Sequence, residues 1–294
     1  MTDQAPAVHH LDQEYDTSER FTAKLVSSDR ITPYEADEIR EIVLDVDRPG
    51  FDYEVGQSIG IFAPGDPELG GKEHFRLYSV ADLPERSDKG LPRIKICVRR
   101  CKYIDEYSGE EYRGVASNYL CDLRAGDRIT LSGPYGLPFE VPEDHSSNLI
   151  LICTSTGIAP FRAFVKHIYR DIPDWSGAVW LFYGATNPLE MVYMNDEHDD
   201  FVNYYDRDTF AAFKALSPRP HWSDPIAWDG AIGDRADELL RYFQNPKTHV
   251  YVAGLESMRE QLDKVFSARM GSEVKWQRRK AEMMAGERWV ELLY

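Results

Sequence analysis

The chain has 294 residues, of which 43% are apolar, and its formal net charge at pH 7 is −16. This length predicts two ordinary domains, each with a hydrophobic core of its own. The acidic balance argues against general nucleic-acid binding, because such a site needs a broad basic surface. The sequence has no apolar run near the roughly 18 residues of a membrane span and no signal-peptide pattern. We therefore expect a cytoplasmic protein without membrane insertion.

The cysteines do not form a metal-binding pattern. Cys97 and Cys101 have a C-x3-C spacing, but no further Cys or His stands at a metal-ligand distance from them. Cys121 and Cys153 are isolated in the sequence. We expect no bound metal and four free thiols, which fit a reducing compartment.

The first part of the chain reads as a tail followed by a strand-rich domain. Residues 1–20 are polar and aperiodic, and we expect them to be poorly ordered. Residues 21–145 hold short apolar or alternating runs punctuated by Gly and Pro. The predicted elements are strands at 38–46, 59–63, 93–99 and 129–136, and a helix at 117–123. This pattern predicts a small antiparallel β-barrel.

The segment Arg76-Leu77-Tyr78-Ser79 carries residue types that suit a flavin. In an extended strand, Arg76 and Tyr78 would face one side, and Leu77 and Ser79 the other. The cation could meet a diphosphate, the phenol could cover one face of an isoalloxazine ring, and the Ser79 hydroxyl could bind the ring's redox-active edge. Taken alone, the four residues fit an ordinary surface strand better.

A second motif, Gly114-Val115-Ala116-Ser117, begins the predicted helix. A glycine permits close approach, the first amides of a helix carry positive partial charge, and Ser117 can cap the helix. The sequence permits either a diphosphate site or an ordinary capped helix here. The presence of Arg76 favours the diphosphate.

The pattern changes after a linker predicted at 142–147. Continuous apolar runs at 148–153, 178–183 and 249–253 are each followed by a loop and a candidate helix. This alternation predicts a doubly wound parallel sheet over residues 146–294. Loop 154–160 follows the first run, at the strand end where such sheets bind nucleotide phosphates.

These motifs occur together with Gly56-Gln57-Ser58-Ile59-Gly60 near the start, a glycine motif at 250–258, and a terminal Tyr294. In this order and spacing they resemble the plant-type ferredoxin-NADP reductase family, from about Phe21 to the last residue. The resemblance implies a FAD-binding barrel at 21–145 and an NAD(P)-binding α/β domain at 146–294. It also implies an oxidoreductase that passes electrons between NAD(P)H and a one-electron carrier such as ferredoxin or flavodoxin.

The resemblance also implies roles for single residues. Ser79 would bind the reactive edge of the flavin, and Tyr294 would cover the flavin until nicotinamide displaces it. The residues implied to bind FAD are Arg76, Leu77, Tyr78, Ser79, Val98, Tyr103, Gly114, Val115, Ala116 and Ser117. Those implied to bind the coenzyme are Thr156, Gly157, Ser217, Arg219, Asp229, Gly254 and Tyr294.

The chain departs from the family pattern around the nicotinamide site. Ser155 stands where the family usually has glycine, Ala253 where it often has cysteine, and Leu292 where the plant pattern has a carboxylate. Glu291, one residue earlier, is a candidate proton-relay residue. However, a shift of one residue in an extended tail reverses the side-chain face.

The choice of coenzyme stays open. Ser217 and Arg219 match residues that hold the 2′-phosphate in NADP-specific members, whereas Asp229 and Ala231 replace a lysine and a tyrosine of that pattern. A carboxylate repels a phosphate but accepts hydrogen bonds from a free ribose. The sequence favours neither NADH nor NADPH.

An acidic carrier would need a local basic patch on this acidic chain. One candidate cluster consists of Arg93, Lys95, Arg99, Arg100 and Lys102. The other consists of Lys275, Arg278, Arg279 and Lys280.

Two other functions remain open. The chain could be the reductase component of a separate oxygenase, or an FAD-binding subunit whose changes at Ser155, Ala253 and Leu292 mark lost nicotinamide use.

Overall fold

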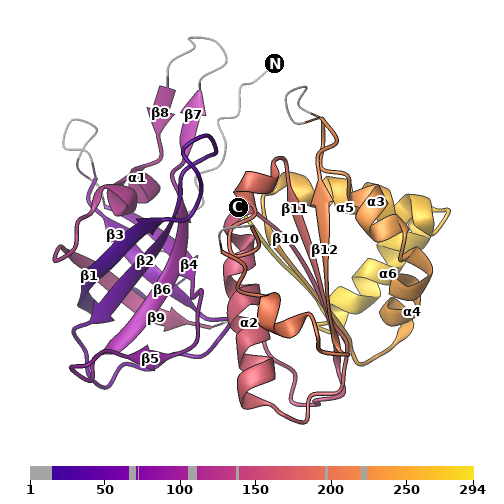
Figure 1. Ribbon diagram of the computed structural model, residues 1–294, viewed down its shortest axis with the longest axis horizontal. Helices are drawn as coiled ribbons and strands as arrows, with labels where there is room; N and C mark the ends of the chain where they lie inside the picture. The colour runs from indigo at the N-terminus through magenta and orange to yellow at the C-terminus, as the bar shows by residue number, and fades with distance from the viewer. Residues whose placement is uncertain are drawn as a thin grey trace.

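The computed structural model describes residues 15–65, 71, 73–104, 111–136, 139–195, 198–219 and 224–294. They form two β-sheet units that lie side by side, with the C-terminus between them (Figure 1). The last strand of the first unit ends at Tyr135 and the first strand of the second begins at Asn148, and the boundary after residue 145 stays a prediction. Residues 1–14 of the predicted tail lie outside the described residues.

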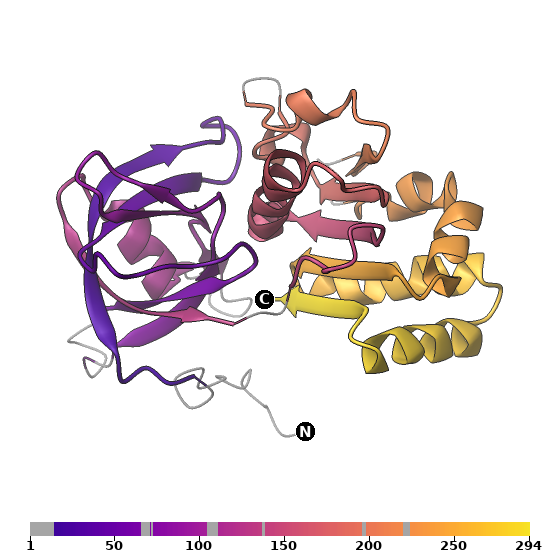
Figure 2. The ribbon, with the colours of Figure 1, turned by 90° about the horizontal axis from the view of Figure 1, so that it is seen from below.

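The first unit is a seven-stranded antiparallel sheet in the order β4-β3-β9-β1-β2-β6-β5, which curls round a core (Figure 2). Its strands are β1 (Arg20–Arg30), β2 (Ile39–Val46), β3 (Ser58–Ala63), β4 (His74–Ser79), β5 (Glu85–Arg86), β6 (Pro92–Arg99) and β9 (Arg128–Tyr135). Side-chain alternation builds the core, since Ala23 and Leu25 of β1 are buried while Lys24 between them is exposed. This arrangement confirms the predicted antiparallel domain.

Two smaller elements complete the first unit. Helix α1 (Val115–Asp122) packs against β3, β4 and β6, and it begins slightly earlier than the sequence predicts. Strands β7 (Lys102–Ile104) and β8 (Glu111–Arg113) form a separate antiparallel pair beside α1 (Figure 1).

The second unit is a five-stranded parallel sheet in the order β12-β11-β10-β13-β14, with helices on both faces. Its strands are β10 (Asn148–Thr154), β11 (Val179–Ala185), β12 (Phe210–Leu216), β13 (Thr248–Gly254) and β14 (Trp289–Leu293). Its α-helices are α2 (Ile158–Asp171), α3 (Trp228–Gly233), α4 (Ala236–Gln244), α5 (Ser257–Arg269) and α6 (Glu273–Ala285). Its 3-10 turns are η3 (Ser155–Gly157), η4 (Pro188–Glu190) and η5 (Val202–Tyr204).

Every residue of the central strand β10 is buried, as expected for a strand covered on both faces. Leu149 and Leu151 pack in the cluster that contains α2, whereas Ile150 and Ile152 pack in the cluster that contains α5 and α6. The predicted doubly wound parallel sheet is therefore confirmed.

One hydrophobic core crosses the boundary between the units. Ile39, Ala81 and Cys97 of the first unit belong to the same buried cluster as Phe161 and Phe164 of α2. Helix α2 is the helix of the second unit that faces the first unit (Figure 1). Shared apolar burial therefore holds the two units together.

A buried arginine adds a polar clamp to this apolar contact. The Arg162 side chain of α2 is only 8% exposed, and it donates a hydrogen bond to the Ala81 carbonyl oxygen at 2.8 Å. Its guanidinium also pairs with Asp82 at 3.1 Å, with Glu41 at 3.4 Å, and with Asp200. Since Glu41 and Asp82 belong to the first unit and Asp200 to the second, one guanidinium joins both.

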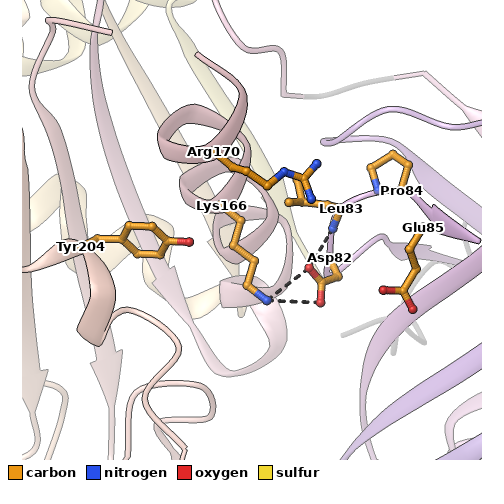
Figure 3. A pocket seen from close by; sticks show the side chains of 7 residues that line it. All are labelled: Asp82, Leu83, Pro84, Glu85, Lys166, Arg170 and Tyr204. Atoms are coloured by element: carbon orange, nitrogen blue, oxygen red, sulfur yellow. Dashed lines mark hydrogen bonds and ion pairs between the residues drawn. The ribbon is translucent and has the colours of Figure 1, made fainter. Parts of the chain in front are cut away.

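Asp82 lies at the centre of this group of charges. Lys166 lies 3.2 Å from both carboxylate oxygens of Asp82 (Figure 3). Lys95 lies 3.1 Å from one of these oxygens. Burial alone would raise the pKa of Asp82, but Arg162, Lys166 and Lys95 outweigh it and lower the pKa to about 2. A cavity of about 350 Å³ lies beside Asp82 and Lys166. It is lined by Asp82, Leu83, Pro84, Glu85, Lys166, Arg170 and Tyr204 (Figure 3).

Within the described residues, no helix is long and apolar enough to cross a membrane, and no three Cys, His, Asp or Glu side chains form a metal-binding group. All four cysteines are free, and only Cys101 is exposed. Burial raises the pKa of the Cys97 thiol to about 12, so this thiol is a neutral packing group.

We expect Arg162→Met to destabilise the protein strongly. The substitution keeps an apolar side chain but leaves three carboxylates without their shared partner, at a cost of about 3–5 kcal/mol. Arg170→Met on the same helix is the control, because Arg170 is exposed and within the described residues pairs only with its neighbour Asp171. This substitution should cost less than about 1 kcal/mol. Urea unfolding of both variants measures the difference, and equal costs would contradict the clamp.

Candidate functional site

A narrow crevice of about 80 Å³ opens where the carboxyl ends of β10 and β11 meet the first unit. Asp37, Ile39 and Arg99 line it from the first unit. The second unit contributes Thr154, Ser155, Gly184, Ala185, Thr186, Glu190, Ile226 and Leu255. Ligands of open parallel sheets bind at this edge, beside the strand where the chain order reverses. That strand is β10, since β11 and β13 flank it.

Two loops meet at the crevice through glycines that leave no room for a side chain. A Cβ on Gly157 would lie 2.2 Å from the Ala253 carbonyl oxygen, and a Cβ on Gly254 would lie 2.3 Å from Thr154 Oγ1. Gly254 also has a φ of 139°, which glycine adopts more readily than other residues. The loops after β10 and β13 therefore pack backbone against backbone, and such close approach is typical of phosphate-binding loops.

Ser155 has a backbone conformation that favours glycine. Its φ of 51° lies in the left-handed region, which costs a residue with a Cβ about 1–2 kcal/mol. Its carbonyl oxygen accepts a hydrogen bond from Tyr183 Oη at 3.1 Å. The left-handed backbone conformation thus explains why the family pattern has glycine at this position. Serine adopts the same turn here at a cost in conformational energy.

The C-terminal residue is anchored on this loop. Tyr294 Oη and Thr156 Oγ1 form a hydrogen bond of 2.5 Å, and the Tyr294 N–H donates to the Gly254 carbonyl oxygen at 3.0 Å. The structure therefore brings together four residues that we predict for the coenzyme site, namely Thr156, Gly157, Gly254 and Tyr294. The C-terminus lies between the two units, on the side toward the barrel (Figure 2).

The segment Arg76-Leu77-Tyr78-Ser79 ends strand β4 and alternates between its faces. Leu77 packs with a small aromatic cluster, whereas Tyr78 packs against the barrel core. Arg76 is exposed, and the face that it shares with Tyr78 adjoins α1. Ser79 Oγ lies 3.4 Å from Ser58 Oγ at the strand end.

Helix α1 begins on the predicted glycine turn, with Gly114 as its N-cap residue. Among the described residues no side chain caps this helix, so the first N–H groups, at Val115 and Ala116, are left for another acceptor. Ser117 differs from the expected cap, because its buried hydroxyl accepts a hydrogen bond from the Cys101 N–H at 3.1 Å. A Cβ on Gly114 would lie 3.0 Å from Ser117 Oγ and 3.1 Å from Cys101 Cβ, so a larger residue would fit this turn tightly.

These features fit FAD. The exposed guanidinium of Arg76 and the uncapped start of α1 are donors on adjoining elements that suit a diphosphate, and Tyr78 supplies a half-buried aromatic ring. The Val98 side chain is 1% exposed in the barrel core, so only its backbone is left to contact a cofactor, and its predicted role stays a prediction. The backbone of Tyr103 lies in β7 opposite Tyr112, but its side chain lies outside the described part of the chain.

The predicted coenzyme-specificity residues lie after β12 and at the start of α3. Ser217 Oγ donates to the Asp224 carbonyl oxygen at 2.7 Å, and Arg219 pairs with the Asp224 carboxylate at 2.8 Å. Asp229 is exposed in the first turn of α3. The Asp224 carboxylate already pairs with Arg219, and Asp229 adds a second carboxylate to this group of residues. The arrangement therefore favours neither NADH nor NADPH.

Glu291 does not face the crevice, which corrects its predicted role as a proton relay. Its side chain is 9% exposed, and its carboxylate binds Lys280 at 2.7 Å and Arg259 at 2.8 Å. It also accepts a hydrogen bond from Trp289 Nε1 at 2.8 Å. Burial alone would raise the pKa of Glu291, but these partners lower it. Strand alternation turns Glu291 toward α5 and α6, while Leu292 packs in the cluster on the α2 side.

Neighbouring acids pair with most residues of both predicted basic clusters. In the first cluster, Arg93 pairs with Asp45, Lys95 with Asp82, Arg99 with Asp37, Arg100 with Glu38, and Lys102 with Glu111. In the second, Arg278 and Arg279 pair with Glu282, and Lys280 is buried with Asp263 and Glu291. The first cluster is therefore largely neutralised, whereas in the second a single glutamate serves two arginines and Lys275 is exposed, so the second cluster keeps positive charge.

The sequence reasoning missed several residues that shape the site. Asn118 donates hydrogen bonds to the carbonyl oxygens of Cys101 at 2.9 Å and Gly114 at 2.8 Å, and thereby fixes the turn before α1. Asp37 and Glu190 line the crevice from loops that no motif marks. Their positions depend on tertiary folding. In the sequence, the one feature that could have pointed to them is an acidic residue near the end of a predicted strand.

Glu291→Gln should lower stability while leaving coenzyme chemistry intact. The change removes the charge that balances buried Lys280, at a cost of about 2–3 kcal/mol. Glu282→Gln is the matched control, because it also loses contacts to two cations but at the surface, where about 1 kcal/mol or less is expected. We expect the rate of flavin reduction by coenzyme to stay within about twofold. A large loss of rate at normal stability would restore the relay.

Ser155→Gly should stabilise the protein. Relief of the left-handed strain is worth about 1–2 kcal/mol, and the added freedom of glycine in the unfolded chain offsets about 0.5–1 kcal/mol. A net gain of about 0.5–1 kcal/mol in the free energy of unfolding follows. Ser155→Ala keeps the strain and should show no gain. Thermal and urea unfolding test both variants, and a less stable glycine variant would show that the serine hydroxyl matters more than the backbone.

Comparisons with known proteins agree with this geometry. Residues 151–264 match the family described as the oxidoreductase NAD-binding domain. The chain is similar in fold to ferredoxin-NADP+ reductase from Plasmodium falciparum, with a TM-score of 0.68 at 21% identity, over 95% of this chain and 98% of that one.

Curated relatives extend over both units. The ferredoxin-NADP reductase of Picosynechococcus sp. is 31% identical over 258 residues, which are 85% of this chain but only 64% of that longer protein. The ferredoxin-NADP reductase of Spirulina sp. is 32% identical over 258 residues, which are 85% of this chain and 87% of that protein. The chain therefore belongs to the ferredoxin-NADP reductase family.

Proposed function

We propose that the protein is a flavoprotein oxidoreductase that transfers electrons between NAD(P)H and a one-electron carrier, such as ferredoxin or flavodoxin, through FAD. The observation that carries this proposal is the crevice. There, two glycine-packed loops of a nucleotide-binding sheet open beside the barrel and the terminal Tyr294. FAD, when bound, takes a hydride as two electrons and releases electrons singly.

The barrel residues would bind and orient this cofactor. Arg76 and the first amides of α1 would hold the diphosphate, because both present donors on adjoining elements. Tyr78 would cover one face of the flavin ring, and the Ser79 hydroxyl would bind its reactive edge. Asn118 supports this arrangement by fixing the turn at Gly114.

The second unit would position the nicotinamide nucleotide. Gly157 and Gly254 would let the diphosphate approach the backbone, as their packing supports. The bond between Thr156 and Tyr294 must break before a nicotinamide ring takes the place of the phenol. The freed Thr156 hydroxyl is then available to the coenzyme.

The carrier and the location are inferred from the family and from the chemistry of the chain. Family membership supports a ferredoxin-like partner, although the paired basic residues of the first cluster give no separate support for an acidic one. Four free cysteines support a reducing compartment such as the cytoplasm.

The decisive experiment mixes the FAD-loaded protein with NADH and, separately, with NADPH under anaerobic conditions. We expect rapid bleaching of the flavin band by at least one coenzyme, and the faster coenzyme reveals what Asp229 does. Reduction by dithionite is the control that the bound flavin can be reduced. Bleaching by dithionite but by neither coenzyme would overturn the proposal in favour of a flavoprotein without nicotinamide use.

A further inference from the structure

The crevice carries one acidic charge that no ion pair balances. Three ionisable side chains line it, namely Asp37, Arg99 and Glu190. Asp37 and Arg99 form an ion pair, so their charges cancel. Glu190 forms no ion pair within the described residues. The crevice therefore has a net negative charge, and that charge belongs to Glu190.

The backbone that carries Glu190 is held in place from two sides. Asn187 Oδ1 accepts a hydrogen bond from the Leu189 N–H at 3.0 Å and so caps the η4 turn. The buried Tyr183 hydroxyl lies 3.1 Å from the Ser155 carbonyl oxygen and 3.4 Å from that of Glu190. One phenol thus ties the turn with Glu190 to the loop that we assign to the coenzyme.

Burial weakens the screening of this carboxylate. Burial raises the pKa of Glu190, and the charge of Asp37 raises it further, while Arg99 lowers it. A half-buried charge interacts with its neighbours more strongly than a charge in bulk water. Glu190 is therefore suited to act on a charge that enters the crevice.

The two redox forms of a nicotinamide ring differ in just such a charge. The reduced dihydropyridine ring is neutral, and the oxidised pyridinium ring is a cation. In hydride transfer, a C–H bond of the reduced ring breaks, and the hydrogen leaves with both electrons to form a new bond on the flavin. The coenzyme is oxidised, the flavin is reduced by the same two electrons, and positive charge develops on the nicotinamide ring.

We propose that Glu190 is a specificity residue: it makes the coenzyme site prefer the oxidised, cationic nicotinamide ring to the reduced, neutral ring when that ring takes the place of the Tyr294 phenol, beside the loop that lines the crevice. The inference rests on the proposed function and deepens it. A fixed carboxylate stabilises the cation, and also the transition state in which that cation develops. Glu190 thereby favours hydride release from the coenzyme, and electrons flow from NAD(P)H toward the flavin.

Equilibrium binding to the FAD-loaded protein tests the inference without turnover. The ligands are the oxidised coenzyme and its unreactive 1,4,5,6-tetrahydro analogue, which has a neutral ring, both in the NAD or NADP form that bleaches the flavin. Glu190→Gln should weaken binding of the oxidised coenzyme about tenfold and that of the analogue less than about twofold. Glu238→Gln, at an exposed position of helix α4, is the matched control and should change neither constant.

A pH series adds a signature that a purely structural role would not produce. The preference for the oxidised ring should be full where Glu190 is ionised, and should fall as the pH drops through its raised pKa. Asp37 and Arg99 are the charged groups that act on Glu190, and their ion pair is retained in the variant. The Glu190→Gln protein should show little of this dependence, and Glu190→Asp should recover part of the preference.

Three outcomes overturn the inference. An unchanged ratio of the two binding constants in Glu190→Gln, or an equal loss for both ligands, shows that Glu190 does not sense the ring charge. In both cases the flavin is still bleached by coenzyme, so the proposed function stands. If neither ligand binds the unmodified protein and neither coenzyme bleaches it, the proposed function fails and this inference fails with it.

Discussion

The Arg162 clamp is the contact on which the candidate site depends, because the crevice exists only while the two units are held together. Helix α2 begins directly after the loop that carries Gly157, and Arg162 lies in its first turns. Its partners Ala81 and Asp82 follow closely after Ser79, the last residue of β4. A single buried guanidinium therefore fixes the distance between the loop that we assign to the coenzyme and the strand that we assign to FAD. The shared apolar core provides most of the buried area between the two units, and the ion pairs of Arg162 fix how the units are oriented.

The opposite face of the parallel sheet holds the C-terminus in a similar way. Lys280 is buried between Asp263 and Glu291, and Arg259 approaches Glu291 from α5. These contacts fix β14, which is the edge strand of the sheet and leads into Tyr294. Buried ion pairs on this face thus determine where the terminal ring lies. These contacts explain why the chain end departs from the plant pattern, which has a carboxylate where this chain has Leu292. The carboxylate of Glu291 stabilises the fold through its ion pairs, and Leu292 packs on the side of α2.

Local periodicity was enough to predict the fold class and which faces of the barrel elements carry the residues that we assign to FAD. Arg76 and Tyr78 share a face because a strand alternates, and the start of α1 follows from a glycine before an apolar helix. Periodicity fails where the answer depends on which side of an element meets another unit. Val98 alternates into the core, and the Ser117 hydroxyl accepts a hydrogen bond from Cys101, between β6 and β7, instead of capping its helix. The roles of Arg162, Asp37 and Glu190 could not be predicted, because each depends on a contact between the two units or between loops that no motif marks.

The distribution of charge within the crevice matches that of a nicotinamide dinucleotide better than the net charge of the chain suggests. A protein with a net charge of −16 must bind an anionic diphosphate. The side chains contribute little attraction, since Asp37 cancels Arg99. The glycine-packed loops after β10 and β13 instead leave room for a diphosphate to approach the backbone, whose N–H groups carry positive partial charge without adding a cation. The negative charge of Glu190 remains near the part of the crevice that faces the barrel, because its neighbours there are Asp37 and Arg99 of the first unit. Positive dipoles at the loops and a carboxylate toward the barrel are complementary to a ligand with an anionic centre and a ring that becomes cationic when it is oxidised.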